Sequence, residues 1–106
     1  MATITFISHD GVERTVQAAT GCSLMEAAIW NRVPGIDAAC GGDGGCATCQ
    51  VYADENWRAA LGEPSFAERR TLFYAFERND RSRLACQIRV TEELDGLVVR
   101  TPLRQY

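Results

Sequence analysis

The sequence predicts an α+β domain in which a helix packs across one face of a mixed sheet. Two alternating segments flank an Asp-Gly turn near the N-terminus, two Ser-x-x-Glu motifs each precede an apolar stretch, and strand-like stretches follow later. Alternation indicates strands, and the Ser-x-x-Glu motif is typical of helix starts. The 106 residues are enough for one domain, residues 1–106, and too few for two.

A β-hairpin is expected first. Thr3–Ser8 alternates, with Ile4 and Phe6 on one side of the predicted strand. The Asp10-Gly11 pair is typical of a tight hairpin turn, and Glu13–Ala18 is expected to return as the second strand.

The two capping motifs predict two helices. Ser23 with Glu26, and Ser65 with Glu68, have the spacing at which the side chain of each residue caps the backbone N–H of the other. The helices are expected to end near Asn31 and Arg78, with apolar faces formed by Leu24, Ala27, Ala28 and Trp30 in the first and by Phe66, Leu72, Phe73 and Phe76 in the second.

Three more strands complete the prediction. Thr48–Ala53, Arg83–Val90 and Leu97–Thr101 are the expected strands. Residues 54–64 are expected to be a connector, and residues 92–96 a turn.

Composition excludes several classes of function. The formal charge is −3 and the pI is about 5.1, so nucleic acid is not expected as a partner, since phosphate binding needs a basic surface. All 11 basic residues are arginines, which excludes Schiff-base lysines and the P-loop lysine. No signal peptide is expected, and no apolar run approaches the roughly 18 residues that a membrane span needs. The protein is therefore predicted to be cytoplasmic.

Five cysteines occur beside a single histidine, His9, and four of the cysteines have metal-ligand spacing. The pattern is Cys40-x5-Cys46-x2-Cys49 with a distant Cys86. Four soft thiolates suit zinc or an iron–sulfur cluster, whereas a Rieske centre would need two histidines. Structural zinc usually takes two Cys-x2-Cys pairs, and the plant-type 2Fe-2S pattern differs only by one residue in its first gap. The fifth cysteine, Cys22, stands alone and is predicted to be a small buried hydrophobic residue.

The loop between the first cysteines favours a cluster. Glycine allows positive φ and a close approach of backbone N–H groups to a negatively charged centre. A phosphate loop is disfavoured, because no lysine follows. The predicted cluster loop consists of Gly41, Gly42, Asp43, Gly44 and Gly45, followed by the small residues Ala47 and Thr48.

With these motifs, the chain resembles the adrenodoxin and putidaredoxin class of 2Fe-2S ferredoxins, and within it the bacterial putidaredoxin-like redoxins. The resemblance covers nearly the whole chain. Besides the cysteine pattern it rests on Ser8-His9-Asp10-Gly11, Leu24-Met25-Glu26-Ala27-Ala28, Cys46-Ala47-Thr48-Cys49, Ser82-Arg83-Leu84 before Cys86-Gln87-Ile88, and Glu93-Leu94-Asp95-Gly96-Leu97-Val98-Val99.

The resemblance implies a β-grasp fold and one 2Fe-2S cluster in a monomeric electron-transfer protein that is not an enzyme. It implies electron shuttling from an FAD-containing, NAD(P)H-dependent ferredoxin reductase to a cytochrome P-450 monooxygenase. The positions matching Cys40 and Cys46 hold the outer iron in the family, and those matching Cys49 and Cys86 hold the inner iron. The segment from Asp37 to Thr48 is then the expected electron exit.

Three positions or segments depart from the family or bear on docking. Gln50 follows the third cysteine, where the family often has histidine. The segment from Phe66 to Arg78 is usually strongly acidic, but here its charges are mixed and could equally form a solvated face. Candidate docking residues are Asp37, Glu68, Arg69, Arg70, Glu77 and the terminal Tyr106.

Two alternatives remain open at this point. The same carrier could supply electrons for iron–sulfur cluster assembly, or the cysteines could hold zinc in a non-redox module that binds a protein partner. An absorption spectrum separates zinc from a cluster, and reconstituted turnover with partners separates the two carriers.

Overall fold

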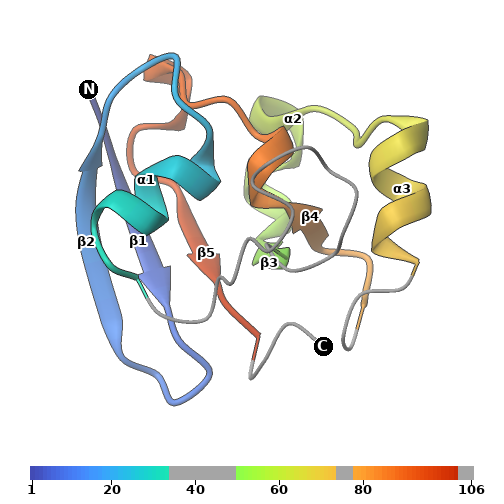
Figure 1. Ribbon diagram of the computed structural model, residues 1–106, viewed down its shortest axis with the longest axis horizontal. Coiled ribbons are helices and arrows are strands. Elements are labelled where there is room, and N and C mark those ends of the chain that lie inside the picture. The colour runs from blue at the N-terminus through green and yellow to red at the C-terminus, as the bar shows by residue number, and fades with distance from the viewer. Residues whose placement is uncertain (34–49, 74–77, 103–106) are drawn as a thin grey trace.

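The computed structural model describes residues 1–33, 50–73 and 78–102, and there the chain forms a five-stranded sheet in the order β2-β1-β5-β3-β4 (Figure 1). β1 (Ala2–Ile7) and β2 (Glu13–Ala18) form the predicted antiparallel hairpin. In β1, Ala2, Ile4 and Phe6 are buried and alternate with less buried neighbours, as the sequence predicted. The turn residue Gly11 has a φ of 88°, which glycine adopts readily.

The last strand along the chain lies in the middle of the sheet. β5 (Val98–Arg100) runs parallel to β1 on one side and antiparallel to β3 (Gln50–Ala53) on the other. β4 (Ser82–Leu84) pairs with the far side of β3 and forms the outer edge. β5 therefore joins the N-terminal hairpin to the β3–β4 pair.

The first helix packs across one face of this sheet, as predicted. α1 (Leu24–Trp30) begins with the full capping box, since Glu26 N donates to Ser23 Oγ at 3.0 Å and Ser23 N donates to Glu26 Oε1 at 2.9 Å. The helix lies over the hairpin side of the sheet in Figure 1. The prediction of its apolar face is wrong in one respect, because Trp30 is 65% exposed and Met25 is buried in the core instead.

The second predicted helix is shorter than expected, and the side that faces the core is not the predicted one. α3 (Phe66–Leu72) ends with Phe73 as its C-cap, and residues 74–77 with Phe76 lie outside the described residues. Leu72 is buried as predicted, but Phe66 and Phe73 are 78% and 64% exposed, so their assignment to the core is wrong. The inward side of the helix carries Leu72 and Glu68.

Short helices replace parts of the predicted strands and connector. The expected strand over residues 83–90 ends after β4 in a 3-10 turn, η2 (Ala85–Gln87), and the turn before β5 contains η3 (Glu92–Leu94). The connector after β3 contains η1 (Glu55–Trp57) and α2 (Arg58–Leu61). Of the predicted strand 48–53, residues 48 and 49 lie outside the described residues.

Candidate metal centre

Cys86 is the one predicted cluster ligand among the described residues, and it lies in η2 immediately after β4. Its neighbours Leu84 and Ala85 are fully buried, whereas the Cys86 side chain is half-buried and packs against the edge of the core. The thiol therefore lies on a well-packed support and still reaches the surface. A side chain held this way suits a centre that must exchange electrons with another protein.

Backbone hydrogen bonds hold the chain on both sides of Cys86. Before it, Leu84 pairs with Gln50 in the antiparallel β3–β4 register. After it, Ile88 O accepts from Leu24 N at 2.8 Å, at the first residue of α1. Cys86 is thus held between the sheet and α1, with little freedom to shift.

Residues 34–49 follow α1 in the sequence and precede β3, the strand that pairs with β4. Val33, just after α1, is buried and donates its N–H to Ala28 O at 2.9 Å. Arg32 has a φ of 57°, a left-handed conformation that ends the helix. Gln50, directly after Cys49 in the sequence, is fully buried at the start of β3 and lies opposite Leu84, two residues from Cys86. Both ends of this stretch are therefore anchored in the core.

The other predicted ligands and the glycine loop lie within residues 34–49, outside the described residues. This holds for Cys40, Cys46 and Cys49, for Gly41, Gly42, Asp43, Gly44 and Gly45, and for Asp37, Ala47 and Thr48. Within the ranges 1–33, 50–73 and 78–102, three metal-binding side chains nowhere come together. Their role as ligands and loop therefore stays a prediction from the sequence.

The donor chemistry at Cys86 fits a 2Fe-2S cluster. Thiolate sulfur is the ligand of such clusters, and N–H groups aimed at sulfur help to hold the negative charge. The side chain of Gln87 supplies one such N–H group, since its Nε2 donates to Cys86 Sγ at 3.5 Å. The half-buried position of this thiol suits a cluster that must be shielded from water on one side and be accessible on the other.

Cys22 stands apart from this arrangement. It precedes the α1 capping box, packs against the core while half-buried, and donates its thiol hydrogen to Ala19 O at 3.0 Å. Burial raises the pKa of this thiol, and the carboxylate of Glu26 raises it further. The core contact agrees with the predicted packing, but the side chain is half-buried and not fully buried as predicted.

The prediction that Glu68 is a docking residue is wrong. Its side chain is 2% exposed and forms a buried ion pair with Arg83, whose Nε donates to Glu68 Oε2 at 2.7 Å and whose Nη2 donates to Oε1 at 3.2 Å. Leu84 N donates to the same Oε2 at 2.9 Å. Ser65 caps α3, but Glu68 turns to β4 instead of completing the predicted capping box. This buried ion pair is the feature that the sequence analysis missed.

The remaining docking candidates divide into two groups. Arg69 and Arg70 are exposed on α3, so they are available to a partner and stay candidates. Glu77, Tyr106 and Asp37 lie outside the described residues.

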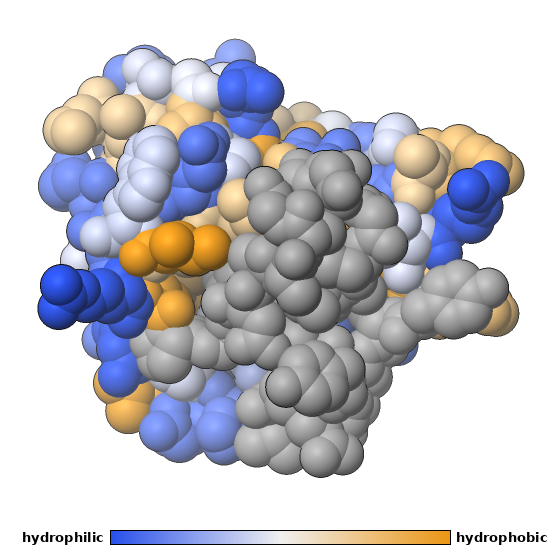
Figure 2. Space-filling view, in the orientation of Figure 1, coloured by the Kyte–Doolittle hydropathy of each residue, from blue (hydrophilic) through white to orange (hydrophobic). Residues whose placement is uncertain are grey.

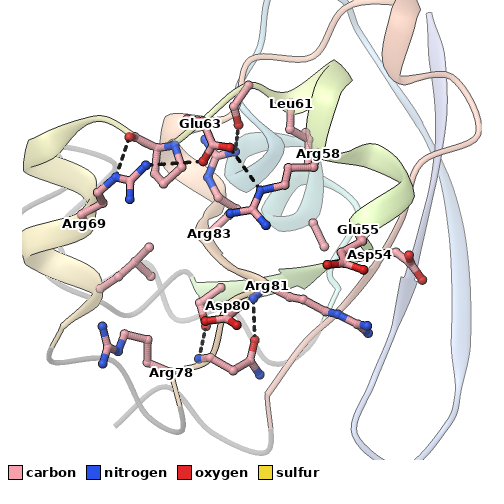
Figure 3. A pocket seen from close by; sticks show the side chains of 16 residues that line it. Asp54, Glu55, Arg58, Leu61, Glu63, Arg69, Arg78, Asp80, Arg81 and Arg83 are labelled. Atoms are coloured by element: carbon pink, nitrogen blue, oxygen red, sulfur yellow. Dashed lines mark hydrogen bonds and ion pairs between the residues drawn. The ribbon is translucent and has the colours of Figure 1, made fainter.

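A cavity of about 200 Å³ lies beside α3, and three of its charged side chains form ion pairs with one another (Figure 3). Glu63 accepts from Arg58 Nε at 3.1 Å and from Arg69 Nη2 at 3.4 Å, so one carboxylate bridges two arginines. Cys86, the predicted ligand that the structure describes, does not line this cavity. The cavity is therefore described as part of the surface around α3.

Comparison with known proteins identifies the kind of centre. The family model of the 2Fe-2S iron-sulfur cluster binding domain matches residues 7–91. Ferredoxin CarAc of Sphingomonas is 47% identical over 96% of this chain and 94% of its own. Putidaredoxin of Pseudomonas putida is 41% identical, with both chains covered completely. The cluster interpretation is thereby confirmed over the zinc alternative.

Solved structures show the same fold. The crystal structure of a ferredoxin from Rhodopseudomonas palustris matches with a TM-score of 0.95 at 46% identity, over 98% of this chain and 99% of the other. Putidaredoxin in its covalent complex with putidaredoxin reductase matches with a TM-score of 0.88 at 40% identity, over 94% and 97% of the two chains. In the described part of the chain, no helix has the length and apolar character to cross a bilayer.

Proposed function

The chain belongs to the 2Fe-2S ferredoxins of the adrenodoxin and putidaredoxin type, and on this premise we propose that it carries single electrons from an FAD-containing, NAD(P)H-dependent ferredoxin reductase to a cytochrome P-450 monooxygenase. It is an electron carrier with one 2Fe-2S cluster and not an enzyme. The proposal concerns the two partner proteins, the residues that hold the cluster, and the cellular compartment.

The full-length likeness to putidaredoxin carries the proposal. Putidaredoxin has been solved in complex with its reductase, and the likeness in sequence and fold supports a reductase as the electron donor here. The monooxygenase as acceptor rests on the resemblance to the adrenodoxin and putidaredoxin class. We place the exchange in the cytoplasm, because a reducing compartment keeps thiols available as ligands.

We propose that Cys40, Cys46, Cys49 and Cys86 hold the cluster, with the first two at the outer iron. When bound, a 2Fe-2S cluster takes up and releases one electron. The contribution of the described residues is to keep the site still while the charge changes by one unit. Cys86 is fixed between β4 and α1, and Gln87 donates an N–H to its sulfur.

Reconstitution tests the proposal directly. The purified holoprotein is combined with a ferredoxin reductase and a cytochrome P-450 from the same organism, and NAD(P)H oxidation and product formation are measured. We expect turnover that needs all three proteins. Reduction by the reductase without any P-450 turnover, combined with support of cluster formation by a cysteine desulfurase and scaffold, would favour the cluster-assembly alternative.

A further inference from the structure

An exposed side chain donates a hydrogen bond to the sulfur of the predicted ligand Cys86. Gln87 Nε2 lies 3.5 Å from Cys86 Sγ, and Gln87 is exposed at the end of η2, whereas the Cys86 side chain is half-buried. A glutamine amide has two N–H donors, so one of them can point at the sulfur while the other stays in water. The sulfur therefore has a polar donor that comes from the surface and not from the core.

The backbone that carries this donor is held on both sides. Ile88 N donates to Ala85 O at 3.3 Å and closes the turn over residues 85–87. Ala85 and Ile88 are both buried in the core. Because the main chain is fixed in this way, the amide of Gln87 stays within reach of Cys86 Sγ, and the contact depends on the rotation of one side chain.

A donor at this position acts differently on the two oxidation states of a bound cluster. Reduction adds one negative charge to a centre that its thiolate and sulfide ligands already make negative. An N–H group aimed at a ligand sulfur stabilises the extra charge, so it favours the reduced state over the oxidised state. Hydrogen bonds to the sulfurs are accordingly among the factors that set the potential of iron–sulfur clusters.

We infer that Gln87 raises the reduction potential of the cluster through its hydrogen bond to Cys86 Sγ. This inference rests on the proposed function, in which Cys86 is a cluster ligand. Gln87 acts through the sulfur of its neighbour, so it is a positioning residue and not a ligand. Because its side chain is exposed, the potential can be changed at this surface position without repacking the core.

A matched pair of substitutions tests the inference. Gln87→Leu removes the amide, and Gln17→Leu makes the same change in β2, at the opposite edge of the sheet from β4. Gln17 is also exposed, and its Nε2 donates to Thr3 Oγ1 at 3.0 Å, so each substitution removes a side-chain hydrogen bond. β2 lies at the left of Figure 1, and the surface on that side carries strongly hydrophilic side chains in Figure 2.

Spectroelectrochemical titration of the purified holoproteins gives the reduction potential. We expect Gln87→Leu to make reduction about fivefold less favourable, which corresponds to a potential about 40 mV lower, given roughly 59 mV per tenfold change for a one-electron couple. The control should differ from the unmodified protein by less than about 1.5-fold, and neither variant should change the unfolding midpoint, because exposed substitutions cost little stability. An unchanged or higher potential in Gln87→Leu overturns the inference, as does an equal fall in both variants.

Pulsed EPR of the reduced protein detects the hydrogen bond itself. With ¹⁵N in the side-chain amides of glutamine, the nitrogen that donates to a ligand sulfur couples to the unpaired electron of the reduced cluster. We expect a ¹⁵N signal that is present in the unmodified protein and in Gln17→Leu and is missing from Gln87→Leu. Identical ¹⁵N spectra in all three proteins overturn the inference.

A second pair keeps the inference testable if Gln87→Leu does not hold the cluster. Gln87→Glu keeps the shape of the side chain, but its carboxylate has no hydrogen to donate at pH 8, and Gln17→Glu changes the net charge equally. The potential should fall more in Gln87→Glu than in Gln17→Glu, and an equal fall in both contradicts the inference.

The experiment also separates this inference from the proposed function. If the unmodified protein shows no 2Fe-2S spectrum, or if Cys86→Ala keeps that spectrum unchanged, the proposed function or its ligand assignment fails. If the cluster is present and is lost in Cys86→Ala, while the Gln87 variants have the same potential as their controls, the proposed function stands and only the role of Gln87 fails.

Discussion

Replacing Glu68 with glutamine should destabilise the protein far more than replacing any exposed carboxylate. The substitution keeps the size of the side chain but removes its charge and one of its acceptor oxygens. In the native structure the Glu68 carboxylate accepts two hydrogen bonds from Arg83 and one from Leu84 N. The two side chains are 2% and 10% exposed, so water cannot replace the lost partner.

The size of the effect follows from this burial. Removing one partner of a buried ion pair costs about 3–5 kcal/mol, because the remaining charge stays buried without compensation. Arg83 would keep its bond to Gly62 O at 2.9 Å but lose its counter-charge. Since domains of this size unfold with about 5–15 kcal/mol, the variant should lose a large part of its stability. At about 4–8 °C per kcal/mol, we expect the melting temperature to fall by more than about 10 °C.

The assay compares Glu68→Gln with Glu63→Gln in the holoprotein. Glu63 also pairs with arginines, but its side chain is 57% exposed, and exposed pairs contribute about 0–1 kcal/mol. Far-UV circular dichroism gives the unfolding midpoint, and visible absorbance gives the temperature at which the cluster is lost. Because Leu84 N and Cys86 are two residues apart, we expect both midpoints to fall together in Glu68→Gln.

Equal midpoints for Glu68→Gln and Glu63→Gln would refute the reasoning. The double variant Glu68→Met with Arg83→Met provides a further check. Replacing both charges by apolar side chains removes the uncompensated charge, so most of the stability should return. Leu84 N loses its acceptor, and a residual loss of about 1–3 kcal/mol should therefore remain.

Three further outcomes are expected. Cys86→Ser should abolish the visible absorption of the cluster, whereas Cys22→Ser should leave that absorption unchanged. In the holoprotein at pH 8, iodoacetamide should modify Cys22 more slowly than a small-molecule thiol of ordinary pKa. The reason is that burial raises the pKa of Cys22 and keeps the thiol protonated. Mass spectrometry measures the rate, and an equal or faster modification of Cys22 would contradict this expectation. Gly96→Ala should lower the free energy of unfolding by about 1–2 kcal/mol in urea titrations, since Gly96 has a φ of 93° and alanine is strained there.

The two capping motifs show how far sequence reasoning reaches. Ser23 and Glu26 form the predicted box, because both partners are local and nothing competes for Glu26. Ser65 also caps its helix, but Glu68 bonds to Arg83, 15 residues further along the chain. A local pattern contains no information about such a distant partner, so the same motif predicts one helix start completely and the other only in part.

The phenylalanines of α3 show a second limit of sequence reasoning. A spacing of seven residues correctly places Phe66 and Phe73 on one side of the helix, but periodicity does not say which side faces the core. The sheet decides this through Arg83, which draws Glu68 inward and leaves the phenylalanines outside. The cysteine pattern, in contrast, indicates its chemistry from spacing alone, because thiolates have few other roles at that spacing.

The position of β5 makes the continuity of the sheet depend on three residues that follow the other four strands in the sequence. Among the described residues, the β1–β2 hairpin and the β3–β4 pair are joined within the sheet through residues 98–100, while the backbone hydrogen bonds of Leu24 and Cys22 link the two parts outside it. Without residues 98–100, the sheet would consist of two separate parts, each with an unpaired edge where β5 now lies. A cluster held in part by Cys86 would therefore depend on a sheet that is closed by a strand outside the cysteine pattern.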